Sequence, residues 1–277
     1  MITKDRIIFL DTNVISDIGR LEKDEIRKVI YQISVELKLC VALTPFNIME
    51  IERIPDERVK ENVHWLLDIL NIVHFKGMIE LFQEEMDNGL DFNPIKFSTT
   101  LISTMNGKPA NFLSLLSSLK KNDEYVQAVL KHNQILEQLR MRFTEKPNIT
   151  LEKFICLEAK HNPILRQKST THTLRELGEQ APAFVSYCCS LYNKIGSKGL
   201  RNNPGEMNDN AMSYIFPYVG YIVTEKRLAN LYISVRDKGL IPTLINTVIL
   251  KHSDVISKDN GILKISILDA IRTDKFN

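Results

Sequence analysis

The chain has 277 residues, of which 44% are hydrophobic and 25% are charged, and its formal net charge is +2. This composition is that of a globular protein with material for one large or two modest domains, and it excludes fibrous and disordered chains, which are far richer in Gly and Pro. So small a net charge does not by itself indicate nucleic-acid binding.

No apolar segment has the length of a membrane span, and the short apolar run near the N-terminus follows charged residues. We therefore expect no membrane contact and a cytoplasmic location. The four cysteines lack the spacing of a metal site and are interpreted as buried thiols. The six histidines also lack metal-ligand spacing, which favours structural or surface roles for them.

The first predicted element is a strand at Ile7 to Leu10, which Asp11 follows directly. Short apolar runs rich in β-branched residues are typical of strands that are buried on both faces. Thr12 or Asn13 can cap a following helix. Because ligands bind beyond the carboxyl ends of strands in open parallel sheets, Asp11 is a candidate functional residue, with a polar loop or cap as the alternative.

Three helices and a second strand are expected next. Residues 22–39 and 59–73 have apolar side chains three and four positions apart, which predicts helices, and residues 41–45 predict a second buried strand. Asn47 is placed to cap a helix that carries Glu50 in its first turn. A second carboxylate therefore follows a second strand.

The pattern changes between residues 75 and 199. Residues 111–119, 123–143 and 174–195 have helical apolar spacing, and strand-like runs are nearly absent. We interpret this region as an α-helical insertion in an α/β domain. Residues 140–201 carry more Lys and Arg than Asp and Glu, which is either a solvated helical face or a surface for phosphates.

The pattern of a strand followed by a carboxylate returns near the C-terminus. Asp209 is placed to open a helix over residues 210–218, and a third strand is predicted from Tyr221, ending at Thr224 and Glu225. The remaining apolar runs are typical of further strands, without residues of evident chemistry.

Parallel strand order would bring these carboxylates to one edge of the sheet. They are Asp11, Glu50, Asp209 and Glu225. Four carboxylates at one place cannot all stay ionised without a compensating cation, and Mg²⁺ or Mn²⁺ prefers such oxygen ligands. The sequence therefore predicts an acidic metal site of the kind that hydrolyses phosphodiesters.

These segments resemble the PIN-domain ribonucleases. Residues 7–16 (IIFLDTNVIS) look like the first strand and Asp-Thr-Asn of that family, residues 44–54 (TPFNIMEIERI) like its second motif, and residues 208–231 like its third and fourth motifs. The resemblance implies an α/β fold: a PIN-like domain with a central parallel sheet flanked by helices. Residues 1–74 and 200–277 would form this domain, and residues 75–199 would form the α-helical insertion subdomain.

The resemblance also implies a Mg²⁺- or Mn²⁺-dependent endoribonuclease that hydrolyses single-stranded or structured RNA. Asp11 and Asp209 would be the principal ligands, Glu50 would bind the metal or position water, and Glu225 would be an outer or second-metal acid. Ligands, water and substrate would be held by Thr12, Asn13, Asn208, Thr224, Lys226 and Arg227.

The chain departs from the family pattern at three positions. Pro217 interrupts a helix that is usually unbroken in the family. Many members have Asp just before the last strand, where this chain has Gly220, and an acid where this chain has Lys226, so that Glu225 comes one residue early. The alternative is therefore a catalytically degraded PIN-like scaffold that binds RNA or a protein partner, and a helical interaction protein with incidental carboxylates is the third hypothesis. The sequence leaves open an inhibitor protein and a homo-oligomer as further partners.

Overall fold

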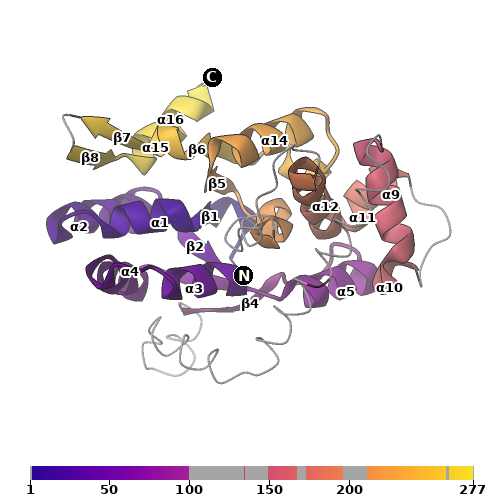
Figure 1. Cartoon of the computed structure of the whole chain (residues 1–277), viewed down its shortest axis with the longest axis horizontal. Helices are drawn as coiled ribbons and strands as arrows, with labels where there is room; N and C mark the ends of the chain where they lie inside the picture. The colour runs from indigo at the N-terminus through magenta and orange to yellow at the C-terminus, as the bar shows by residue number, and fades with distance from the viewer. Residues whose placement is uncertain are drawn as a thin grey trace.

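The protein is an α/β structure built around a mixed, mostly parallel sheet. A computed structural model describes residues 2–99, 134, 149–166, 173–195, 211–259 and 262–276. These residues contain a six-stranded sheet in the order β4-β3-β2-β1-β5-β6 and a two-stranded sheet, β7-β8 (Figure 1). The strands are β1 (Ile7–Leu10), β2 (Cys40–Leu43), β3 (Ile72–Phe75), β4 (Ile95–Ser98), β5 (Tyr221–Thr224), β6 (Val248–Lys251), β7 (Ile256–Asp259) and β8 (Ile262–Ile265).

Strand β1 lies between β2 and β5 and pairs with both in parallel. β2 also pairs in parallel with β3, and β5 with β6. β4 is antiparallel to β3. The strands that follow β1 in the chain, β2 to β4, therefore lie on one side of it. The strands on its other side, β5 and β6, come from the C-terminal part of the chain.

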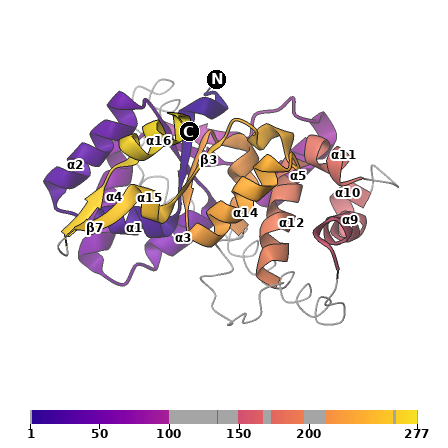
Figure 2. The same cartoon turned by 90° about the horizontal axis from the view of Figure 1, so that it is seen from above.

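Helices cover both faces of the sheet (Figure 2). On one face lie α1 (Thr12–Gly19), α2 (Lys23–Tyr31), the π-helical turn η2 (Gln32–Glu36), α3 (Pro45–Glu52), α4 (Glu57–Ile69), α15 (His252–Val255) and α16 (Ile267–Phe276). On the other lie α5 (Met78–Asn88), α9 (Leu151–His161), α10 (Pro163–Arg166), α11 (Leu174–Gln180), α12 (Pro182–Ile195), the 3-10 helix η3 (Ser213–Tyr218) and α14 (Lys226–Asp237). Two further 3-10 turns are η1 (Lys4–Arg6) and η4 (Pro242–Leu244).

The alternation of side chains along β1 explains its uninterrupted apolar sequence. Ile7 and Phe9 belong to the hydrophobic cluster on one face, and Ile8 and Leu10 belong to the cluster on the other. Successive side chains of a strand point to opposite faces, so a strand with both faces covered needs apolar residues at every position. The structure confirms the strands predicted at residues 7–10, 41–45 and 221–224, which are β1, β2 and β5.

The expected helix over residues 59–73 is partly wrong, because its last residues form β3. Apolar residues of a short run fit helical spacing and a buried strand equally well, and here pairing with β2 decides the outcome. β4 lies within residues 75–199, where the sequence predicts almost no strands. Its four residues are too few and too polar to predict a strand, and it forms one because it pairs with β3.

The described helices between residues 75 and 199 share a core with the sheet. Phe82, Phe154 and Phe184 belong to the same cluster as Phe9 of β1. The predicted helix over residues 174–195 is two helices, α11 and α12, separated at Ala181. Apart from residue 134, the helices predicted at 111–119 and 123–143 lie outside the described residues, and the bounds of the insertion remain a prediction.

In the part of the chain that the structure describes, no helix is both long and apolar enough to cross a membrane. The cysteines are free thiols; Cys188 and Cys189 are buried as expected, whereas Cys40 and Cys156 are half-buried.

Candidate functional site

The carboxyl ends of three neighbouring parallel strands define one edge of the sheet. Directly after β1, β5 and β6 come Asp11, Glu225 and His252, and a helix follows each strand. β1 and β5 are also the point where the chain connections diverge to the two sides of the sheet. Ligands of open α/β sheets bind at such a point, outside the carboxyl ends of the strands.

Asp11 is held by the backbone and by a buried hydroxyl. Its N–H donates to the carbonyl of Val223 (2.9 Å). Its carboxylate accepts hydrogen bonds from the N–H of Asn13 (3.2 Å), from the hydroxyl of Thr224 (2.7 Å) and from the backbone of Glu225. Asp11 itself is therefore the N-cap of α1, and the expectation that Thr12 or Asn13 caps this helix is wrong.

The side chain of Asp11 is only 2% exposed, which makes ionisation costly. Burial raises the pKa of this carboxyl group above its ordinary value. The hydrogen bonds from Thr224, Asn13 and Glu225 and the charge of His252 oppose the rise without cancelling it. Ionising Asp11 therefore costs more in the folded protein than in water.

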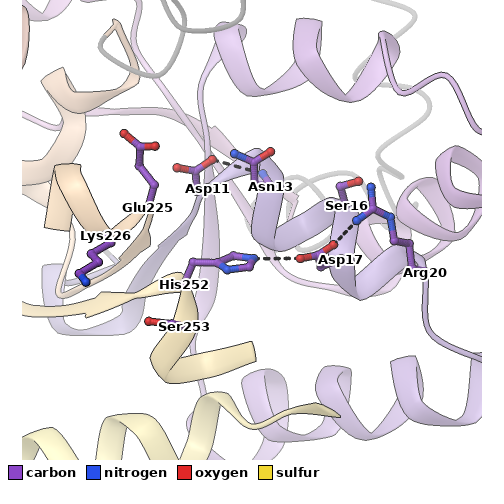
Figure 3. A pocket seen from close by; sticks show the side chains of 9 residues that line it. All are labelled: Asp11, Asn13, Ser16, Asp17, Arg20, Glu225, Lys226, His252 and Ser253. Atoms are coloured by element: carbon purple, nitrogen blue, oxygen red, sulfur yellow. Dashed lines mark hydrogen bonds and ion pairs between the residues drawn. The ribbon is translucent and has the colours of Figure 1, made fainter. Parts of the chain in front are cut away.

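A pocket of about 420 Å³ opens beside Asp11 (Figure 3). Asp11, Glu225 and His252 lie around one part of it, and Asp17 and Arg20 follow along α1. Its full lining is Asp11, Asn13, Ser16, Asp17, Arg20, Glu225, Lys226, His252 and Ser253. The pocket therefore combines carboxylates with basic side chains.

The other residues predicted to bind substrate fall into two environments. Asn13 and Lys226 line the pocket, whereas Thr224 is fully buried and positions Asp11 instead of facing a ligand. Arg227 lines a second hollow of about 500 Å³, and its guanidinium donates to the carbonyl of Asn193 (3.1 Å). Lys226, in the first turn of α14, lines both hollows.

Glu50 is not among the residues that line the pocket. It lies half-buried in α3, whose N-cap is Thr44 and not Asn47. Asn47 is instead the third residue of that helix; its side-chain oxygen accepts from the N–H of Thr44 (3.0 Å), and its own N–H donates back to the hydroxyl of Thr44. The helix starts earlier than expected, which places Glu50 in its second turn.

Asp209 and Asn208 lie outside the described residues, as do residues 140–148, 167–172 and 196–201 of the basic segment 140–201. Within the described ranges, no three His, Cys, Asp or Glu side chains are arranged to hold a metal ion. Asp11 and Glu225 are the two predicted ligands that the structure brings to one pocket.

Sequence reasoning missed five residues that line the pocket, Ser16, Asp17, Arg20, His252 and Ser253. Asp17 accepts a hydrogen bond from Nε2 of His252 (2.9 Å) and pairs with Arg20. His252 was interpreted as a structural or surface residue, yet it is the first residue after β6. The available signal was its place after the apolar run at residues 248–250, the same pattern that marked Asp11 and Glu225.

The departure at Gly220 has a structural reason. A Cβ atom at this position would lie 2.7 Å from the carbonyl oxygen of Lys4 and 2.9 Å from Cα of Asp5, so no larger residue fits. Gly220 also precedes β5, whereas Asp11 lies beyond the carboxyl end of the neighbouring β1. An acid at position 220 would be about 13 Å from that edge, the length of four strand residues. Gly220 therefore says nothing against a site at Asp11.

No family model, no curated protein and no solved structure matches this chain.

Proposed function

We propose that the protein is a metal-dependent endoribonuclease with a PIN-like α/β domain, which hydrolyses RNA phosphodiester bonds in the pocket beside Asp11. The observation that carries this proposal is the buried carboxylate of Asp11 at the divergence point of the sheet, with its pKa raised and its oxygens directed by three hydrogen bonds. The resemblance of residues 7–16, 44–54 and 208–231 to PIN-domain ribonucleases supports the same function.

The described residues suit a hard divalent cation. Asp11 and Glu225 offer carboxylate oxygens at one pocket, and the cost of ionising Asp11 falls when a cation binds. Asp209 and Glu50 are the further ligands that the resemblance implies. A bound Mg²⁺ or Mn²⁺ would lower the pKa of a water molecule and neutralise charge on the phosphate.

The protein residues have separable roles in this proposal. Thr224 and the N–H of Asn13 hold the carboxylate of Asp11 in one orientation. Lys226 and Arg227, both exposed at the start of α14, would contact phosphates of the RNA backbone. Such contacts give salt-dependent binding with little sequence preference.

The decisive experiment is cleavage of a panel of RNAs and single-stranded DNAs by the purified chain, with Mn²⁺, with Mg²⁺ or with EDTA. The variants are Asp11→Asn and, as a matched control, Asp24→Asn, which removes the same charge from an exposed position of α2 that pairs with Arg27. We expect metal-dependent cleavage of RNA by the wild type and by D24N, and none by D11N. Equal rates for D11N and the wild type would refute the proposal.

The same experiment separates the alternative function. A catalytically degraded scaffold would cut no nucleic acid under any condition. It would also show no rise in melting temperature with Mn²⁺ or Mg²⁺, because an ion stabilises a fold only when it binds the native state. Thermal melting of the wild type and D11N over a metal titration therefore complements the cleavage assay.

A further inference from the structure

A second polar pair lines the same pocket and has no role in the function proposed so far. Nε2 of His252 is 2.9 Å from Oδ2 of Asp17. The two residues are 235 positions apart in the chain, and the fold brings them together because α1 follows β1 and α15 follows β6 at the same sheet edge. Figure 3 shows the imidazole extending across the pocket wall from α15 toward Asp17.

The contact orients the imidazole and leaves one nitrogen for a ligand. Since Nε2 is held by Asp17, Nδ1 is the nitrogen that remains for a group in the pocket. The His252 side chain is 32% exposed and that of Asp17 is 15% exposed, so the pair is fixed on the protein side and reachable from the pocket. A carboxylate that accepts from one imidazole nitrogen fixes the orientation of the ring, and the other nitrogen is then the one that can exchange a proton with a ligand.

We propose that His252 donates the proton to the leaving oxygen during the phosphodiester hydrolysis, and that Asp17 is the residue that positions it. This inference rests on the proposed function. An oxygen of water forms a bond to phosphorus, and the bond from phosphorus to the leaving oxygen breaks, its electron pair going to that oxygen. The Nδ1 proton of the His252 imidazolium moves to the same oxygen, the attacking water loses a proton to solvent, and the imidazole regains one from solvent.

The neighbouring charges agree with this division of roles. Asp11 and Glu225 lie at the part of the pocket suited to a cation, and Lys226 lies at its border. His252 and Asp17 supply the proton-transfer group on the α1 and α15 wall. A general acid of this kind contributes about 10²- to 10⁴-fold to a rate.

The test compares two leaving groups. One substrate is an RNA oligonucleotide that the wild type cuts, with a 2′-deoxy sugar at the cleaved linkage. The other is identical except for sulfur in place of the bridging oxygen that leaves, as identified from the product ends. A thiolate departs without a proton, so loss of a proton donor lowers the cleavage rate of the oxygen substrate only.

The variant is His252→Gln, whose amide can still donate to Asp17 but carries no transferable proton. The matched control is His64→Gln, which alters a similar histidine pair, with Glu52 at 3.1 Å, between α4 and α3. We expect H252Q to cut the oxygen substrate about 10²- to 10⁴-fold more slowly and the sulfur substrate within ~10-fold of the wild type. H64Q should match the wild type on both.

Two outcomes with folded H252Q overturn the inference. An equal loss on both substrates would assign His252 a purely structural role, and unchanged rates would assign it none. If H252Q lacks a cooperative melting transition, Asp17→Asn takes its place, and the same selective loss on the oxygen substrate is required. A wild type that leaves RNA intact overturns the proposed function itself, whereas RNA cut equally by wild type and H252Q overturns this inference alone.

Discussion

Replacing Thr224 by Val tests whether a buried hydroxyl supports the charge of Asp11. The two side chains are nearly equal in volume, Thr224 is fully buried, and its hydroxyl lies 2.7 Å from Oδ2 of Asp11. The variant therefore removes one hydrogen bond without leaving a large cavity. A hydrogen bond to a charged group is worth about 1.5–3 kcal/mol, and one between neutral groups about 0.5–1.5 kcal/mol.

The cost of T224V should depend on pH in a defined direction. The pKa of Asp11 is raised in the folded state, so its contribution to stability is complete below the unfolded pKa of about 3.9 and is lost as pH rises through the folded pKa. Thr224 opposes that rise in pKa, and its loss raises the pKa further. We expect T224V to lose more unfolding free energy at pH 8 than at pH 5, with both losses within about 0.5–3 kcal/mol.

Urea unfolding of T224V and of Thr247→Val at both pH values measures this difference. Thr247 is a matched control, because it is also buried and its hydroxyl donates to a neutral group, the carbonyl of Val219 (3.3 Å). T247V should lose about 1 kcal/mol at both pH values. A loss for T224V that equals that of T247V and does not change with pH would refute the idea that Thr224 supports an ionised Asp11.

Three further changes test the core, the sheet edge and the RNA contact. Burial raises the pKa of Glu85 to about 8, so the free energy of unfolding of the wild type should fall by about 4 kcal/mol as pH rises from 4.5 to 9. In urea unfolding, Glu85→Gln should remove most of this pH dependence. An equally steep pH dependence for E85Q would contradict the role of Glu85. Gly220→Ala should cost about 1–3 kcal/mol, because its Cβ would press on the carbonyl of Lys4, whereas Gly77→Ala, with open space around it, should cost less in the same assay. Lys226→Ala should weaken binding to every RNA sequence alike and lower the slope of log affinity against log salt by about 1 in a titration; an unchanged slope would exclude a phosphate contact there.

Local sequence determined the central strands and the polar residues that follow them. The short apolar runs ending at Leu10 and Val223 are typical of strands covered on both faces, and a polar residue directly after such a strand lies at the sheet edge. Asp11 and Glu225 could therefore be named as candidates before the fold was known. The cap of a helix was less certain, since Asp11, Thr12 and Asn13 are all good capping residues and only the backbone angles choose among them.

Only the tertiary structure decided which of these residues meet. Strand order and the direction of β4 depend on pairing between segments far apart in the chain, and local periodicity carries no record of that pairing. Because β6 lies next to β5, His252 comes to the pocket of Asp11 and contacts Asp17, although the three residues lack any motif spacing. Glu50 fits its motif yet is not among the residues that line the pocket, and local sequence carries no record of that.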